Sequence, residues 1–154
     1  MKNRILTKDE YYLTIAESVS RRSTCLRRLY GAVIVRDDEI ISTGYNGAPR
    51  GAYNCCDNGS CARLNIPHGE RYELCRAVHA EANAIISAPR DRMIGATLYL
   101  VGFDYDTGRY IKNIMPCSMC KRLIINSGIM KVVVRDTDTE CLCRYISPTE
   151  WIGE

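Results

Sequence analysis

Two short stretches decide how this chain folds and what it can bind: HAE at residues 79–81 and PCSMC at residues 116–120. Zinc in a catalytic site usually takes three protein ligands and leaves a fourth position for water. His79, Cys117 and Cys120 form such a set, and the two cysteines are one helical turn apart. Both thiolates can face one ion if a helix begins at Cys117, which Pro116 favours because it lacks an N–H donor. The two stretches therefore predict a zinc site where two helices begin.

The carboxylate of Glu81 separates this pattern from a structural zinc site. Glu81 lies two residues after His79, an offset that lets it reach a metal-bound water instead of the metal. Zinc lowers the pKa of such a water toward about 7, and a carboxylate there can pass the proton to a ring nitrogen and a leaving amine. A structural site is normally closed by a fourth protein ligand. The pattern H-x-E…P-C-x-x-C is typical of zinc nucleobase deaminases and disfavours a non-catalytic zinc-binding module.

Length and composition predict a single domain over residues 1–154, with 46% apolar and 25% charged residues. The net charge of +3 suits a small anionic substrate and is too low to favour a nucleic-acid surface. No apolar run reaches membrane-spanning length, so no membrane partner is expected. Nine cysteines in a chain without a secretion-signal pattern favour metal binding or free thiols in the cytoplasm over disulfides.

Hydrophobic periodicity predicts an N-terminal helix, then a hairpin, then alternating helices and strands. The helix over 8–20 places Tyr12, Ile15, Ala16 and Val19 on one face, with Thr7 as its cap. Further helices are expected over 79–88 and 117–126, and strands over 32–35, 40–44, 96–101, 109–114, 131–134 and 141–146. Residues 52–75 form a cysteine-rich loop region without clear periodicity. This order predicts an α/β layered domain with a mixed sheet.

Longer segments around the motifs resemble the deoxycytidylate (dCMP) deaminases of the cytidine deaminase superfamily. The similar segments are STCLR (23–27), GAVIV (31–35), ISTGYNGAPRG (41–51), NCCD (54–57), HAEANAI (79–85) and CKRLII (120–125). The resemblance implies a three-layer α/β/α cytidine deaminase-like fold with a five-stranded mixed sheet. It also implies zinc-dependent hydrolysis of dCMP to dUMP with release of ammonia, with Glu81 carrying the protons.

The resemblance further implies where the substrate binds. Arg27 would lie near the 5′-phosphate, whose oxygens match a guanidinium fork. Asn46 would contact the sugar, and backbone groups around Ala80 and Pro116 would read the pyrimidine edge. Two alternatives remain open from the residues alone: Arg27 can be a solvated arginine like Arg28, and Asn46 a turn residue that needs an unusual backbone angle.

The cysteines outside the catalytic set suggest a second, structural zinc ion, which some members of this family carry. By resemblance Cys25, Cys55 and Cys75 match its ligands, with Cys61 as the fourth and Cys56 or His68 as alternatives. A closed zinc site could hold together residues 52–75, which have too little apolar periodicity to fold alone. The alternative is that these are buried or free thiols. Cys141 and Cys143 lie at strand spacing and are expected in the core.

Several features depart from the family pattern and affect the preferred substrate more than the reaction. Tyr30 stands where the family usually has a small aliphatic residue. Residues 102–115 are longer than the matching family segment and predict an inserted hairpin close to the metal. Residues 135–139 lack the tyrosine that the family often places near the phosphate, and the last helix should be short or absent.

Other functions with related chemistry remain alternatives to dCMP deamination. They are deamination of a tRNA adenosine, or of another nucleoside or nucleotide. Against the tRNA reading stand the STCLR and GYNG segments and the lack of a basic, aromatic-rich surface. The resemblance also implies a homo-oligomer, a dimer or hexamer, and regulation by dCTP and dTTP.

Overall fold

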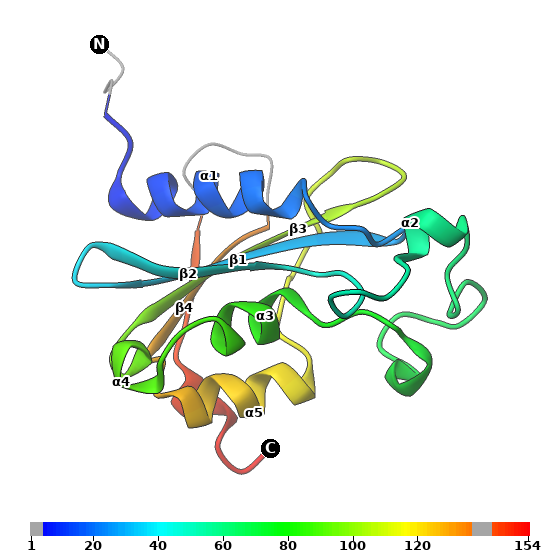
Figure 1. The fold of residues 1–154 in the computed structure, drawn as a ribbon. Helices are drawn as coiled ribbons and strands as arrows, with labels where there is room; N and C mark the ends of the chain where they lie inside the picture. The colour runs from blue at the N-terminus through cyan, green and yellow to red at the C-terminus, as the bar shows by residue number, and fades with distance from the viewer. Residues whose placement is uncertain (1–4, 137–142) are drawn as a thin grey trace.

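A mixed five-stranded sheet forms the centre of the protein, in a computed structural model that describes residues 5–136 and 143–154 (Figure 1). The strand order is β2-β1-β3-β4-β5. β1 pairs antiparallel with β2 and β3, β3 and β4 are parallel, and β5 is antiparallel to β4. The strands are β1 (Arg28–Arg36), β2 (Glu39–Tyr45), β3 (Thr97–Asp104), β4 (Lys131–Arg135) and β5 (Arg144–Ile146). The predicted mixed sheet is confirmed.

Helices cover both faces of this sheet. α1 (Lys8–Ser20) lies on one face, and α3 (Ala80–Ile86) and α5 (Ser118–Ser127) lie on the other (Figure 1). The short elements are α2 (Cys55–Asn58), α4 (Arg90–Met93) and two 3₁₀ turns, Tyr72–Leu74 and Pro148–Trp151. The three layers match the predicted α/β/α arrangement. No helix in the described part of the chain is both long and apolar enough to cross a membrane.

The alternation of strand side chains explains why two separate cores form. On β1, Ala32 and Ile34 belong to the core under α3 and α5, whereas Val33 and Val35 belong to the core under α1. α1 begins as predicted, with Thr7 and Glu10 forming a reciprocal capping box. Its buried face contains Tyr12, Leu13 and Ala16, with Ile15 and Val19 partly buried beside them.

Two glycines let helices rest directly on the backbone of the β1–β2 hairpin. A Cβ at Gly31 would lie 2.0 Å from the carbonyl oxygen of Ala16 on α1. A Cβ at Gly44 would lie 2.2 Å from the carbonyl oxygen of Ala80 and 2.4 Å from the nitrogen of Ala84, both on α3. The first turn of α3 can therefore lie directly against β2 because Gly44 has no side chain.

An irregular segment, residues 46–78, connects β2 to α3, and we call it the capping segment. It contains only α2 and the 3₁₀ turn Tyr72–Leu74 as helical structure. Its two ends are joined by an isolated antiparallel bridge, in which Gly47 and Val78 exchange backbone hydrogen bonds of 3.2 and 2.7 Å. The segment thus leaves the sheet and returns to the same place, one residue before His79.

The predicted strand over 109–114 is wrong. The return chain makes only an isolated bridge between Phe103 and Tyr110, after a turn in which the Asp104 carboxylate accepts two backbone N–H groups. Tyr110 packs on Phe103, and its hydroxyl donates to Glu17 of α1. These contacts hold the return chain against the end of α1, whereas Met115, at the far end of residues 102–115, lines the cavity that contains His79 and Cys117.

The C-terminal predictions are confirmed in part. The strand expected over 141–146 begins at Arg144. Cys143 is partly buried against the core under α1, as expected, and Cys141 lies outside the described residues. The last helix is reduced to the 3₁₀ turn Pro148–Trp151.

Candidate metal centre and its cavity

The predicted metal ligands lie where two neighbouring helices begin. His79 is the N-cap residue of α3 and Cys117 is the N-cap residue of α5, and both have extended backbone angles. The two helices begin on the side of the sheet where the capping segment lies (Figure 1). Cys120, in the first turn of α5, is buried beneath them. The sequence therefore predicted both helix starts, within one or two residues.

The donor atoms have the spacing that a zinc ion requires. The Nδ1 atom of His79 lies 3.4 Å from the sulfur of Cys117 and 3.5 Å from that of Cys120. All three atoms lie within 4.8 Å of one another, and no other group in residues 5–136 and 143–154 converges this closely. Tetrahedral zinc with usual bond lengths places nitrogen and sulfur ligands about 3.6 Å apart. One imidazole and two thiols at this spacing fit zinc.

The environment of Cys117 favours the thiolate, the form that binds metal. A hydrogen bond from Cys120 lowers the pKa of Cys117, and the neighbouring His79 lowers it further, whereas burial opposes both effects. The pKa of Cys120 is raised, first by that shared hydrogen bond and then by burial. The Tyr72 ring lies edge-on to the His79 ring, with centroids 5.3 Å apart, and closes the outer side of the imidazole.

The carboxyl group of Glu81 lies beside the three metal ligands. Its side chain is 5% exposed, in the first turn of α3, two residues after His79. Burial raises the pKa of Glu81, while its own backbone N–H and the positive charge of His79 lower it. Contact with Cys120 keeps the carboxyl beside the metal ligands. A buried carboxyl at this position can hold or release a proton next to a molecule bound at the centre.

The centre lies in a cavity of about 610 Å³. Three parts of the chain line this cavity: the residues before and in the start of β1, the capping segment, and the N-terminal ends of α3 and α5. Its walls include all the predicted ligands and polar contacts except Ala80, Pro116 and Cys120: Cys25, Arg27, Asn46, Cys55, Cys61, Cys75, His79, Glu81 and Cys117. The sulfur of Cys120 lies 3.5 Å from the Nδ1 atom of His79, behind the wall. Ala80 and Pro116 are buried next to His79 and Cys117.

Arg27 and Asn46 both line this cavity, but each also makes internal contacts. The guanidinium of Arg27 donates to the carbonyl oxygen of Arg63 in the capping segment, at 2.9 Å. The amide oxygen of Asn46 accepts from the hydroxyl of Ser23 and the N–H of Tyr30, and its nitrogen donates to the carbonyl of Arg28. Asn46 does not adopt the left-handed backbone angle of a turn residue, so that alternative is wrong.

The four cysteines suggested for a second zinc ion also line this cavity. Cys25, Cys61 and Cys75 lie close enough to Cys55 to raise the pKa of its thiol, which burial raises most. Within the described residues these sulfurs do not converge as closely as the atoms of the His79 centre. Cys56 is exposed, and His68 contacts Arg28 instead of a cysteine.

Five residues of the wall were not predicted as parts of a substrate cavity: Arg28, Tyr30, Arg63, Tyr72 and His68, the last of which the sequence suggested only as an alternative ligand of the second zinc ion. Three of them lie in the capping segment, which carries no periodic signal. Arg28 and Tyr30 were missed because β1 begins at Arg28, four residues before the predicted strand. Extending the alternation of Ala32 and Ile34 backwards would have placed both side chains on the face of α3 and α5.

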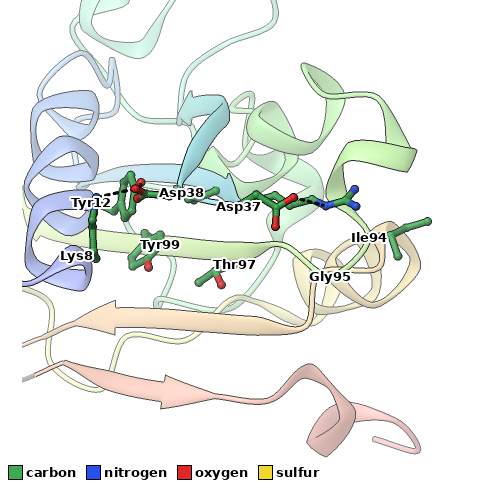
Figure 2. A pocket seen from close by; sticks show the side chains of 10 residues that line it. Lys8, Tyr12, Asp37, Asp38, Ile94, Gly95, Thr97 and Tyr99 are labelled. Carbon is green, nitrogen blue, oxygen red and sulfur yellow. Dashed lines mark hydrogen bonds and ion pairs between the residues drawn. The ribbon is translucent and has the colours of Figure 1, made fainter.

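A second cavity, of about 510 Å³, lies at the turn between β1 and β2, near the start of α1 (Figure 2). Its charged groups bind one another. Lys8 and Tyr12 both contact the carboxylate of Asp38, at 2.7 Å for the lysine, and Arg36 lies 3.7 Å from Asp37. The group offers no set of convergent metal ligands.

Comparison with known proteins agrees with this geometry. Residues 6–136 match the family model described as the cytidine and deoxycytidylate deaminase zinc-binding region. The chain is 42% identical over 132 residues to deoxycytidylate deaminase of Mycobacterium phage D29, covering 81% of this chain and 91% of that protein. It is 40% identical over 126 residues to the Saccharomyces cerevisiae deoxycytidylate deaminase, of whose length it spans only 36%.

Solved structures show the same fold. dCMP deaminase from the cyanophage S-TIM5, in complex with dCMP and dUMP, superposes with a TM-score of 0.56 at 29% identity. That match covers 82% of this chain and 79% of the cyanophage chain. Cytidine deaminase from Burkholderia pseudomallei shares the fold, with a TM-score of 0.57 at 18% identity, over 92% of this chain and 93% of that one.

Proposed function

From the family to which this chain belongs, that of the zinc-binding cytidine and deoxycytidylate deaminases, we propose that it hydrolyses dCMP to dUMP and releases ammonia. The relatives from phage D29 and yeast carry the name deoxycytidylate deaminase. One observation in the structure supports the proposal most: three zinc-type donor atoms converge beside the buried carboxyl of Glu81, at the base of a cavity.

We propose that His79, Cys117 and Cys120 hold the zinc ion. Zinc bound there supplies a water molecule of lowered pKa, beside an open coordination position. The first turns of α3 and α5 add their N–H groups to the same region, which favours negatively charged ligand atoms. The chain itself keeps the donors in place through the packing of both helices on the sheet.

Glu81 is proposed as the proton carrier of the reaction. Its position beside the ligands, and not among them, lets the carboxyl accept a proton from the attacking water. It would then give this proton to the ring nitrogen of the pyrimidine, take the remaining proton of the hydroxyl group added to the ring, and pass that second proton to the departing amine. Burial excludes bulk water from the carboxyl, so protons pass between Glu81 and the substrate instead of solvent.

For the substrate contacts we propose the roles expected from the family pattern. The backbone around Ala80 and Pro116 is buried next to the metal ligands, which suits recognition of the pyrimidine edge. Asn46 lines the cavity and contacts the sugar while it fixes the start of β1. Arg27 contributes positive charge for the 5′-phosphate from the same wall.

We also propose a second, structural zinc ion held by Cys25, Cys55, Cys61 and Cys75. In its favour, all four cysteines line one cavity, and Cys25, Cys61 and Cys75 lie close enough to Cys55 to raise the pKa of its thiol. The capping segment has little regular structure, so a closed metal site would supply the folding energy that an apolar core does not. From the same resemblance we propose a cytoplasmic dimer or hexamer whose activity responds to dCTP and dTTP.

The experiment that tests the function is a panel of cytosine and adenine bases, nucleosides and nucleotides, with ammonia release as the readout. We expect dCMP to be the best substrate. No release from dCMP beside clear release from another compound would replace the substrate assignment.

The mechanism is tested with Glu81→Gln, which keeps the size of the side chain and removes the acid–base group. The rate should fall by about 10²- to 10⁴-fold. Glu150→Gln, the same change at an exposed position near the C-terminus, is the matched control and should keep the wild-type rate. A Glu81→Gln protein with full activity would contradict the mechanism.

A further inference from the structure

The chain between β3 and α5, residues 105–116, passes from one face of the sheet to the other. Its first part lies on the α1 face, where Tyr110 packs on Phe103, a residue partly buried against the core under α1. Its last part lies on the opposite face, because Ile114 is buried in the core under α3 and α5. Figure 1 shows this part of the chain, in yellow, running from the level of α1 to that of α5. The crossing therefore lies where β3 and β4 end.

Arg144 of β5 holds the far end of this crossing. Its Nη2 atom donates to the carbonyl oxygen of Ile114 at 2.7 Å and to Oδ2 of Asp136 at 2.9 Å. Asp136 directly follows β4, and its side chain is 12% exposed. A hydrogen bond from a guanidinium is charge-assisted, and so is stronger than one between neutral groups. One nitrogen thus ties the Ile114 carbonyl to both β4 and β5.

The main chain around Ile114 has no regular structure of its own, since residues 112–116 lie outside every helix and strand. Backbone hydrogen bonds hold the chain on either side. Ile111 donates to the carbonyl of Gly102 at 2.9 Å, and the carbonyl of Cys117 accepts an N–H of α5 at 2.9 Å. Between these two points, Arg144 reaches the main chain from outside the segment. Its contact therefore sets where this stretch enters α5.

The connection from Ile114 to Cys117 is short and stiff. Only Met115 and Pro116 lie between them. The ring of Pro116 fixes its own φ, and the same ring restricts Met115 to extended backbone angles. A displacement of the Ile114 carbonyl therefore meets few dihedral angles that could absorb it before it reaches Cys117.

The two halves of the metal centre are held from opposite edges of the sheet, because β2 and β5 are its edge strands. His79 and Glu81 belong to the start of α3, which rests directly on β2. Cys117 belongs to the start of α5, which the Arg144 contact ties to β5. The sulfur of Cys117 lies 3.4 Å from Nδ1 of His79. A shift of the chain before α5 would therefore change the geometry between the two halves.

We propose that Arg144 is a positioning residue of the metal centre. It holds the carbonyl of Ile114 and thereby fixes Cys117 relative to the ligand and the carboxyl group on α3. The proposal rests on the proposed zinc site, but not on which substrate is deaminated there. Replacing residues that orient metal ligands from outside typically costs about 10- to 100-fold in metal affinity or activity.

The test compares wild type with Arg144→Met, which keeps a long side chain and removes the hydrogen-bond donors. The zinc-loaded proteins are treated with a thiol-alkylating reagent over a series of chelator concentrations, and alkylated Cys117 is measured by peptide mass spectrometry. Zinc protects the thiolate that binds it, so the midpoint reports metal binding at this centre alone. Arg144→Met should lose protection at about 10-fold lower chelator concentration. Its kcat for the best substrate should fall about 10- to 100-fold.

Arg144→Lys is the conservative variant, because the lysine nitrogen has three N–H groups for the Ile114 carbonyl and the Asp136 carboxylate. It should lose less than Arg144→Met, both in zinc protection and in kcat. Asp136→Asn keeps an acceptor for Arg144 and removes the negative charge, so its losses should also be smaller. If Arg144→Met does not fold, Asp136→Asn decides, and wild-type values there overturn the proposal.

Lys131→Gln is the matched control. Lys131 lies at the other end of β4, and its nitrogen is 5.0 Å from the centre of the Tyr145 ring on β5. The change therefore removes a cationic contact between the same two strands, away from the crossing. It should keep the zinc protection and the kcat of wild type.

Wild-type zinc protection and kcat in Arg144→Met would overturn the proposal. A lower denaturation midpoint with both of these values unchanged would also overturn it, because a merely structural role gives that result. Loss of zinc protection in Arg144→Met, in a protein that releases no ammonia from dCMP, would support the positioning role and refute the proposed substrate.

Discussion

Two cavities of similar volume, about 610 Å³ and about 510 Å³, differ in the polar side chains that line them and in how these side chains are paired. In the smaller one, at the β1–β2 turn, Lys8 and Tyr12 bind Asp38, and Arg36 lies beside Asp37 (Figure 2). In the larger one, three zinc-type donors converge, and four arginines line the walls together with two carboxylates. The first set pairs opposite charges with one another, whereas the second gathers three metal-type donors and more positive than negative groups. The kind of polar group in each cavity, more than its volume, separates the two.

The largest effect that bears on this comparison should come from removing a metal ligand. Wild type should contain two zinc ions per chain, one at His79, Cys117 and Cys120 and one at the four cysteines of the second site. Cys120→Ser should contain one zinc ion. It should lose deamination by at least the 10²- to 10⁴-fold that loss of an acid–base group costs. Metal analysis of the purified protein and ammonia release measure the two outcomes.

Cys143→Ser is the matched control, because this partly buried cysteine lies in neither proposed group. It should keep both the metal content and the rate of wild type. One zinc ion per chain in wild type would refute the second site, and an unchanged metal content in Cys120→Ser would refute the first.

A moderate effect is expected from Gly44→Ala, which disturbs one wall of the larger cavity and leaves the smaller one intact. The new methyl group would overlap the backbone of α3 at Ala80 and Ala84, so α3 must move away from the sheet. Overpacking of this kind typically lowers the free energy of unfolding by about 1–3 kcal/mol. Denaturant unfolding measures this loss, and kcat should fall with it because His79 and Glu81 move with α3.

Thr43→Ala, at the exposed neighbouring position on β2, provides the comparison. Its effect on stability should stay within about 0.5 kcal/mol, as for most surface substitutions. Gly44→Ala with wild-type stability and activity would show that α3 does not depend on this close approach.

The smallest effect should come from Asp38→Asn in the second cavity. The hydrogen bond from Lys8, followed by that from Tyr12, lowers the pKa of Asp38. A lowered folded-state pKa gives stability that is present above the unfolded pKa and is lost as pH falls. Asp38→Asn should therefore lower the melting temperature slightly at neutral pH and remove part of the decline on the acid side, with deamination unchanged. Loss of deamination would mean that the smaller cavity is functional too.

The local part of the candidate site could be predicted from the sequence. His79, Glu81, Cys117 and Cys120 depend on helix starts and on spacing within one turn, which are short-range properties. Pro116 and Gly128 mark the limits of the helix predicted over 117–126, and α5 is observed between them. The order of hairpin, helices and strands likewise predicted the mixed sheet. Helical periodicity predicted the face of α1 that contains Tyr12 and Ala16, but missed Leu13, which is also buried there.

The remaining part depends on contacts between residues far apart in the chain. His68 meets Arg28, and Tyr72 meets His79, only because residues 46–78 fold back over the sheet, and no periodic pattern signals that path. The expected strand at 109–114 failed for a similar reason. Tyr110 is drawn to Glu17 of α1, a contact that the local turn sequence does not indicate.

The bridge between Gly47 and Val78 has a practical consequence for protein engineering. It closes the excursion at its base, so residues 48–77 leave and rejoin the fold at one place. Closing a loop of twice the length costs only about 0.6 kcal/mol more. Insertions of other lengths and compositions can therefore be made within these residues to select libraries with new ligand preferences, provided that Cys55, Cys61, Cys75 and Tyr72 are kept.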